Sequence, residues 1–196
     1  MASLKVSFRK LDQLEFQCYE NALRLHLDSV LLFRERSFPS AFALSVIASE
    51  EFGKGFALAE ISYQAHLNKG FHEEDKKYLR KLLSDHKIKQ GWFASHVFGG
   101  LELARQLRQL KKYERIQTEK NNAIYVGVRS GNHQIVRPFL VSRSKALHQV
   151  RVVNDSLIDF IEGTLSDDYG FEGVFDDFLR RRGLLRKLKR AAEILR

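Results

Sequence analysis

Apolar and small residues recur at spacings of three and four along most of the chain, which is the period of an amphipathic helix. In the first such segment, charged residues such as Glu15 and Arg24 fall outside the stripe. The stripe itself consists of Leu11, Leu14, Cys18, Ala22, Leu25, Ser29 and Leu32. This pattern predicts one long first helix that ends close to Arg34.

A second helix is predicted from Pro39 to about His66. Proline suits the first turn of a helix, and Ser37 just before it is a candidate cap. Small residues fill much of this segment: Ser40, Ala41, Ala43, Ser45, Ala48, Ser49, Gly53, Gly55, Ala57 and Ala59. Small side chains let a neighbouring backbone come close, so we expect this helix to be the central, most buried one. Gly53 and Gly55 each cost about 1 kcal/mol of helix propensity relative to alanine, which tight packing would offset.

Residues 73–113 have the pattern of one long or broken helical stretch. Ser84 and Asp85 interrupt it, and both residue types cap helices well. We therefore expect a helix start at His86.

The remaining segments differ in texture. Residues 121–138 alternate in polarity and contain a turn signal, which predicts a short hairpin or extended loop. Pro138 opens another helical run that extends to about Gly163, and residues 184–195 have the pattern of a basic amphipathic helix.

Together these elements predict an all-α protein: a helical bundle with the short hairpin or loop and a C-terminal helical extension. We expect residues 1–150 to form the bundle. Residues 151–196 would form an acidic and then basic extension that packs on the bundle or on a partner.

Composition places the chain among soluble globular proteins, since its 196 residues are 44% hydrophobic and 29% charged. A single cysteine, Cys18, excludes an internal disulfide framework and fits a reducing compartment. The longest uncharged run, residues 37–49, is too short to cross a bilayer, and the N-terminus has no apolar signal segment. We expect a cytoplasmic protein with no membrane partner.

The formal net charge of +9 is unevenly distributed, and it favours polyanionic partners. Residues 154–177 contain eight acidic residues and no Lys or Arg, whereas residues 180–196 contain eight basic residues and one acid. The preceding part of the chain therefore carries +10 by itself. The basic tail either binds RNA phosphates or folds against the acidic segment.

Two clusters could carry chemistry. Glu50, Glu51 and Lys54 place two carboxylates and an ammonium in one turn of the second helix, directly after an uncharged run. At least one carboxylate should therefore lie near the bundle interior and need a partner. His86 stands among cations, namely Arg80, Lys81, Lys87 and Lys89. A phosphodiester reaction needs a proton acceptor or donor together with cations around the developing oxyanion.

Each cluster also has a structural reading, as an ion pair on a helix or as a surface histidine on a basic face. An Arg and a following His with four to six residues between them would suit a nuclease, and two such pairs occur, Arg80 with His86 and Arg143 with His148. Chance alone gives about two matches to a pattern this loose. The spacing by itself therefore does not select either pair. No spacing of His, Asp, Glu or Cys indicates a metal site.

Four segments carry a resemblance to a known family: Glu20-Asn-Ala-Leu-Arg-Leu through Leu32, Ser37-Phe-Pro-Ser-Ala through Glu50-Glu51-Phe-Gly-Lys54, Asp85-His-Lys-Ile-Lys89, and Lys120 with Ile124-Tyr-Val126. In this order they resemble the AbiV-type abortive infection proteins, a bacterial phage-defence branch of the HEPN superfamily. The resemblance covers roughly residues 10–140. Gly127 stands where the pattern has an acid, and the segment after about residue 150 lies outside it.

The resemblance implies an all-α, HEPN-like helical bundle, often dimeric, and for HEPN proteins generally a ribonuclease site of Arg and His that needs no metal. It favours Arg80 with His86, because that pair adjoins a family motif. The implied catalytic residues are His86, Arg80, Glu50, Glu51 and Lys54. The implied RNA-binding residues are Lys87, Lys89, Lys120 and Tyr125.

The resulting expectation is a phage-defence effector of the abortive-infection type. It would cleave RNA as a metal-independent endoribonuclease without a cofactor, stop translation, and form a homodimer. RNA or the ribosome would be its target, and a phage-encoded protein its activator. The alternative is a non-catalytic defence module that blocks translation by binding the ribosome, RNA or a phage protein, with Glu50, Glu51, Lys54 and His86 as a buried polar network.

Overall fold

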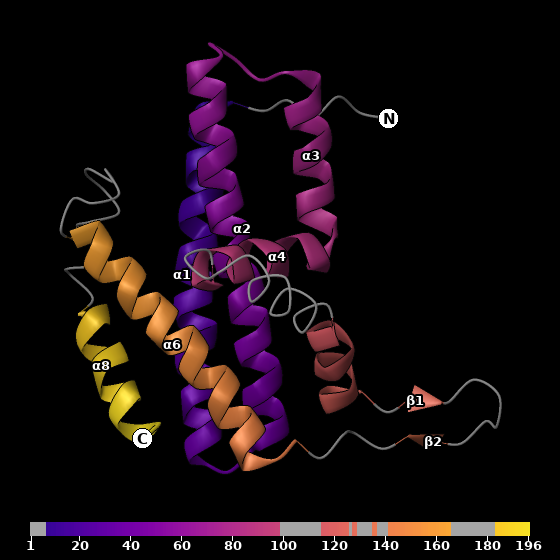
Figure 1. Cartoon of the computed structure of the whole chain (residues 1–196), viewed down its shortest axis with the longest axis vertical. Helices are drawn as coiled ribbons and strands as arrows, with labels where there is room; N and C mark the ends of the chain where they lie inside the picture. Colours follow the sequence, from indigo (N-terminus) through magenta and orange to yellow (C-terminus); the bar gives the residue numbers. More distant parts are fainter. Residues whose placement is uncertain (1–6, 99–114, 126, 129–134, 137–140, 166–182) are drawn as a thin grey trace. The chain divides into compact units, whose positions relative to one another are not determined.

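The structure is a computed structural model of the whole chain (Figure 1). The parts of it described below are residues 7–98, 115–125, 127–128, 135–136, 141–165 and 183–196. Helices dominate these residues, so the predicted all-α fold class is confirmed.

The elements follow the predicted order. The helices are α1 (Phe8–Arg34), α2 (Phe38–Leu67), α3 (Glu73–Ser84), α4 (His86–Phe98), α6 (Arg143–Leu165) and α8 (Leu184–Ile194), and residues 115–124 are also helical. The strands are β1 (Gly127–Val128) and β2 (Ile135–Val136).

Polar residues at helix ends explain two of the boundaries. The Ser37 carbonyl accepts the Ala41 N–H at 2.9 Å, which makes Ser37 the residue that precedes the first turn of α2. Asp85 separates α3 from α4, and its Oδ1 accepts the Lys87 N–H at 2.8 Å. Both predicted cap residues therefore stand where the helices begin, Asp85 as a side-chain cap and Ser37 through its backbone carbonyl.

The predicted hairpin is present but shorter than expected. β1 pairs with β2 in antiparallel fashion, with Gly127 opposite Val136 and Val128 opposite Ile135. Residues 121–124, predicted as extended, are instead helical. The run predicted to open at Pro138 begins as a helix at Arg143; Pro138 itself lies outside the described residues.

The chain folds into two compact units. Unit 1 consists of residues 1–22 and 49–117, and unit 2 of residues 23–48 and 118–196. Helices α1 and α2 are therefore each divided between the two units. The predicted boundary at residue 150 falls inside α6, and a separate extension from residue 151 stays a prediction.

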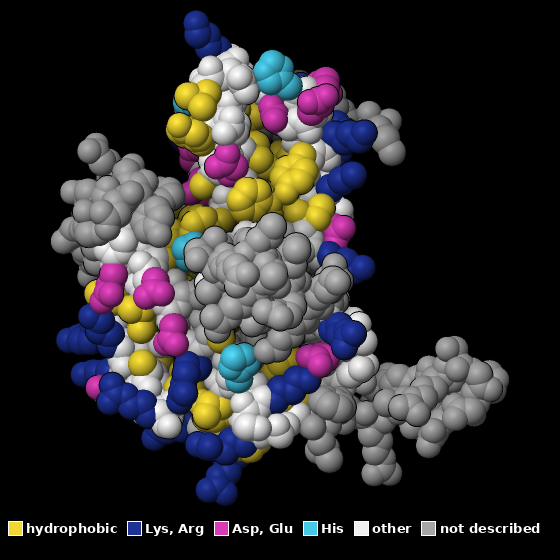
Figure 2. All heavy atoms as spheres, viewed as in Figure 1, with side chains coloured by type: hydrophobic (Ala, Val, Ile, Leu, Met, Phe, Trp, Pro, Cys, Tyr) yellow, Lys and Arg dark blue, Asp and Glu magenta, His cyan; other side chains and the backbone are white. Residues whose placement is uncertain are grey.

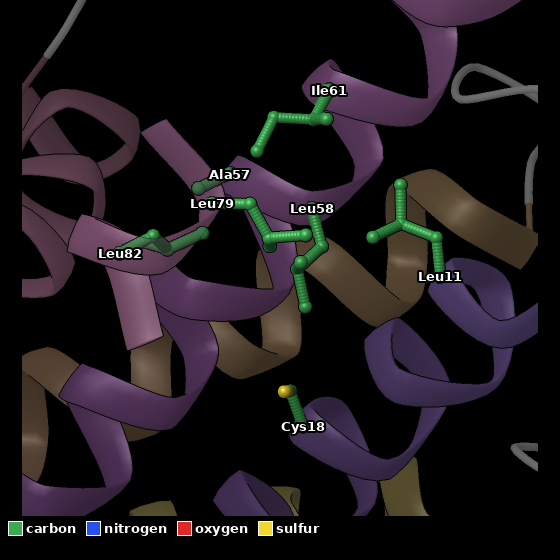
Figure 3. Packing of buried hydrophobic residues seen from close by; sticks show 7 residues of the cluster. All are labelled: Leu11, Cys18, Ala57, Leu58, Ile61, Leu79 and Leu82. Atoms are coloured by element: carbon green, nitrogen blue, oxygen red, sulfur yellow. The ribbon is translucent and has the colours of Figure 1, made fainter. Parts of the chain in front are cut away.

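The core of unit 1 joins three helices (Figure 3). Its buried side chains are Leu11 and Cys18 from α1, Ala57, Leu58 and Ile61 from α2, and Leu79 and Leu82 from α3. Leu14, Phe71, Tyr78, Ile88 and Trp92 pack against it. The first part of the stripe predicted for the first helix, Leu11, Leu14 and Cys18, thus faces this core.

Two glycines of α2 allow unusually close packing in unit 1. A Cβ on Gly53 would lie 2.1 Å from the Lys89 carbonyl oxygen and 2.8 Å from the Phe93 nitrogen, both in the backbone of α4. A Cβ on Gly55 would lie 2.5 Å from the ring of Tyr19. The expected compensation for these glycines is confirmed, because no side chain fits at either position.

Glu15 departs from the simple pattern of the first helix. It lies outside the sequence stripe, yet it is only 9% exposed. Position 15 is four residues after Leu11 and three before Cys18, so it shares their buried face. Burial, followed by the charge of Asp12, raises the pKa of Glu15 to about 8. The buried face of α1 is therefore wider than the apolar positions alone indicate.

Unit 2 is built around α6. His26 Nε2 and Asn154 Oδ1 lie 3.0 Å apart in its interior, which ties α1 to α6. Helix α8 packs along α6 (Figure 1), and it buries Leu184, Leu188 and Ala191. Hence the predicted amphipathic pattern of the last helix is confirmed.

Part of the acidic segment meets the basic tail. Lys189 Nζ of α8 lies 2.7 Å from Glu162 Oε1 of α6, and the Arg151 guanidinium donates to the carbonyl of Leu195. Folding of the tail against the acidic segment therefore occurs where both are described; residues 166–182 lie outside the described part.

Candidate functional site

The two sequence clusters meet in unit 1 through Glu50 and His86. Glu50, on α2, is 3% exposed, and its Oε2 lies 2.6 Å from Nδ1 of His86, the first residue of α4. The His86 side chain is 47% exposed. A buried carboxylate thus holds one ring nitrogen of a half-exposed histidine.

The close packing at Gly53 makes this contact possible. Gly53 lies almost one helical turn after Glu50 and touches the α4 backbone at Lys89, almost one turn after His86. The absence of a side chain at Gly53 therefore sets the helix separation that lets Glu50 reach His86.

A glutamine completes the hydrogen bonds of Glu50. Gln90 Nε2 donates to Glu50 Oε1 at 2.8 Å and lies 3.4 Å from Oε1 of Gln117. The sequence reasoning missed Gln90. Its position four residues after His86, on the same face of α4, is the signal that could have identified it.

The second carboxylate of the pair has a different role. Both carboxylate oxygens of Glu51 accept hydrogen bonds from Lys54 Nζ at 2.8 Å, and Asn21 Nδ2 donates to Glu51 Oε2 at 3.2 Å. Burial works against the charge of Lys54, but the hydrogen bond to Glu51 raises its pKa above the ordinary value. Glu51 and Lys54 therefore form a charged pair that is largely withdrawn from water, with side chains 18% and 14% exposed. Asn21 also escaped the sequence reasoning.

Lys89 and Cys18 are buried nearby. Lys89 is 7% exposed and its Nζ donates to the Leu83 carbonyl at 3.1 Å, so its ammonium joins α4 to the end of α3. Burial, and then the charge of Lys54, lowers the pKa of Lys89. Burial likewise raises the pKa of the Cys18 thiol to about 12. Such a thiol is not a nucleophile near neutral pH.

The other predicted cations of unit 1 are on the surface. Arg80 on α3 and Lys87 on α4 are exposed. No hydrogen bond or ion pair connects the Arg80 side chain to His86 or Glu50 within the described part of the chain. Arg80 and His86 lie on two different helices, separated by the cap at Asp85.

Lys120 and Tyr125 belong to unit 2, whereas Glu50 and His86 belong to unit 1. Lys120 is buried at 5% exposure, and Tyr125 is 65% exposed. Both therefore stay predictions as RNA contacts. His148, the histidine of the other Arg-His pair, is exposed on α6.

Two searches of the described residues bear on function. Among them, no group of three or more His, Cys, Asp or Glu side chains is placed to hold a metal ion. None of the helices examined in this part of the chain is both long enough and apolar enough to cross a membrane.

The Glu50 and His86 pair can move a proton. With Glu50 ionised, Nδ1–H of His86 donates to it, and the neutral ring then carries its lone pair on Nε2. Nε2 makes no hydrogen bond to the described residues, and the ring is open to solvent. The arrangement is that of a general base held in one tautomer by a buried carboxylate.

Comparison with known proteins supports the family resemblance of the motifs that contain Glu50 and His86. A scan of protein families matches residues 11–157 to the family HEPN_AbiV, described as AbiV. Searches of curated proteins and of solved structures returned no match. Because the family match spans most of the chain, this protein belongs to the AbiV family of HEPN proteins, a family of abortive-infection phage defence.

Proposed function

We propose that this phage-defence protein acts on RNA as a metal-independent endoribonuclease that stops translation, with His86 as the catalytic base. The observation that carries the proposal is the 2.6 Å contact between His86 Nδ1 and the buried carboxylate of Glu50. It leaves Nε2 available at the surface of a basic protein.

The reaction follows from this geometry. His86 Nε2 accepts the proton of a ribose 2′-hydroxyl, and the 2′-oxygen attacks the adjacent phosphorus. The bond from phosphorus to the 5′-oxygen breaks, and that oxygen receives the proton held by the His86 imidazolium, passed on through water, which restores the neutral ring. The products are a 2′,3′-cyclic phosphate and a 5′-hydroxyl end. Exposed Lys87, next to His86, is the nearest candidate in the sequence to stabilise the phosphate charge.

The other charged residues have supporting roles in this proposal. Glu50 positions the imidazole and stabilises the imidazolium that forms. The pair of Glu51 and Lys54 adds a fixed, partly buried dipole one turn along α2. Arg80 would contribute through its positive charge when RNA is bound. A phage-encoded activator and a second copy of the chain remain part of the proposal.

The test compares RNA integrity and growth after induced expression of the wild type and of His86→Ala. Loss of a general base lowers the rate by about 10²- to 10⁴-fold, so the variant should lose cleavage and growth arrest. RNA ends should be 2′,3′-cyclic phosphates, and cleavage by the purified protein should persist in EDTA. The matched control is His148→Ala, the exposed histidine of the alternative pair. If His148→Ala abolishes cleavage and His86→Ala does not, the assignment to His86 is wrong.

One observation favours a non-catalytic alternative. Glu50 is almost fully buried and is hydrogen-bonded through both oxygens, to His86 and to Gln90, as a network that fixes the register of two helices would be. In that case His86→Ala should mainly lower the melting temperature, and wild-type protein should block translation while RNA stays intact. Under catalysis the same variant keeps its fold and loses cleavage.

A further inference from the structure

A second site lies in unit 2, built from residues that the proposed reaction does not use. A pocket of about 460 Å³ opens where α1 ends and α6 begins. Its lining residues are Phe33, Arg34, Arg36, Phe38, Arg143 and Ile194. All of them belong to unit 2. The volume falls within the range of sites that hold small ligands.

Three of the described lining residues are arginines, and none has a counter-charge among the residues that the structure describes. Arg34, Arg36 and Arg143 are exposed, and no ion pair connects any of them to the described residues. Glu35 is next to two of them in sequence but does not line the pocket. Figure 2 shows Lys and Arg side chains gathered over this end of unit 2. Three like charges that line one pocket, with no ion pair to a described residue, attract an anion.

Two of the described lining residues, Phe33 and Phe38, are aromatic. The Arg143 guanidinium lies 5.7 Å from the centroid of the Phe33 ring, and the rings of Phe33 and Phe38 are 5.4 Å apart. Stacking on Phe33 orients the planar guanidinium of Arg143. Apolar rings beside an anion also strengthen its hydrogen bonds, since they keep water away from that side. The pocket thus offers charge together with apolar aromatic side chains.

Arg36 has the left-handed backbone conformation that glycine usually adopts after the end of a helix. Arg36 has a φ of 61°, its N–H donates to Phe33 O, and the Ser37 N–H donates to Leu32 O. These two bonds form the Schellman motif that ends α1. Lys69 adopts the same conformation after α2, so the conformation alone marks no site. At Arg36 it provides a variant, Arg36→Gly, that fits the backbone without steric cost.

From these observations we propose that the pocket lined by Arg34, Arg36 and Arg143 binds the phosphate group of a nucleotide, either free or within an RNA strand. Guanidinium groups bind phosphate through two parallel N–H donors, and the aromatic side chains of the lining suit a base or ribose beside the phosphate. The RNA form rests on the proposed function, whereas the free-nucleotide form does not.

Binding of a fluorescein-labelled single-stranded RNA, measured by anisotropy on the full chain, tests the proposal. The variant Arg34→Gln with Arg36→Gln should bind at least about tenfold more weakly than the wild type. Loss of two phosphate contacts should lower the slope of log K against log salt by about 1.4. The matched control, Arg9→Gln with Lys10→Gln, removes the same charge from the exposed start of α1 and should change binding little.

Competition with AMP and with inorganic phosphate distinguishes the two sources. If AMP displaces RNA and shifts the arginine Nε–H signals in NMR spectra of the wild type but not of Arg36→Gly, the pocket binds free nucleotides as well. RNA binding that AMP does not displace, but that Arg36→Gly weakens, assigns it to RNA. Because Arg36→Gly should melt no lower than the wild type, a loss of binding cannot be ascribed to unfolding.

The proposal of a phosphate-binding pocket is wrong if the pocket variant and the control change RNA binding equally and AMP neither displaces RNA nor shifts the arginine signals. Failure of the two proposals can be told apart. If His86→Ala cleaves RNA normally while the pocket variants lose binding, the catalytic assignment fails and the pocket stands.

Discussion

Glu15 makes the stability of this protein depend on pH in an unusual direction. It is 9% exposed, and burial, followed by the charge of Asp12, raises its pKa from 4.5 to about 8. Between these two values the carboxyl is protonated in the folded protein and ionised in the unfolded chain. The folded state therefore binds more protons, and the free energy of unfolding falls as pH rises through this window.

The size of the effect follows from the shift. One pKa unit corresponds to about 1.4 kcal/mol, so the preference of the unfolded chain for ionised Glu15 lowers the free energy of unfolding at pH 7 by about 3 kcal/mol relative to its value at low pH. His26 acts in the opposite sense. Burial lowers its pKa from 6.5 to about 4, so its contribution to stability is lost as pH falls through that range. Below about pH 6.5 the two groups change the free energy of unfolding with pH in opposite directions and nearly cancel. Above about pH 6.5 only Glu15 contributes to the change.

The perturbation is Glu15→Gln, which cannot ionise. We expect the wild type to lose stability from about pH 6.5 to pH 8, while the variant is nearly constant over the same range. Urea unfolding followed by far-ultraviolet circular dichroism measures this directly. The matched control is Glu60→Gln on the exposed surface of α2, whose pH dependence should follow the wild type. Parallel curves for the wild type and Glu15→Gln would refute the reasoning.

Further predictions concern packing and a buried hydrogen bond. Gly53→Ala would place a Cβ 2.1 Å from the backbone of α4 and should lower the free energy of unfolding by about 2 kcal/mol or more. Gly91→Ala has open space at its Cβ and should raise the free energy of unfolding by up to about 1 kcal/mol. Equal unfolding midpoints in urea would contradict this contrast. Asn154→Ala removes the partner of His26 Nε2 and should cost about 1 to 3 kcal/mol, read from the melting temperature. A melting temperature equal to that of the wild type would show that His26 does not depend on Asn154.

Local patterns predicted most of the helices, because a helix depends on neighbours three and four residues away. The caps at Ser37 and Asp85, and the apolar face of α8, follow from this local chemistry. Residues 121–124 show the limit, since their alternating pattern predicted an extended segment but they are helical. Packing can override so short a pattern.

Contacts between distant segments were harder to foresee. The sequence indicated that at least one of Glu50 and Glu51 needed a partner, but not that His86, 36 residues from Glu50, supplies it. Likewise, nothing in the order of residues shows that Lys89 turns its ammonium to the end of α3. Glu15 lay beside an apolar stripe whose buried width is set by the helices that cover it. These features depend on how helices pack, which local periodicity does not determine.

The division of α1 and α2 between the two units has a consequence for how the chain can be cut. Unit 1 ends at residue 22 and resumes at residue 49, and both junctions lie inside a continuous helix. A fragment of consecutive residues therefore cannot contain one complete unit without part of the other. Loss of either unit leaves half of α1 and half of α2 without the neighbours that bury their apolar faces. We therefore expect both units to melt in a single cooperative transition, and expression of either as an isolated fragment to give unfolded protein.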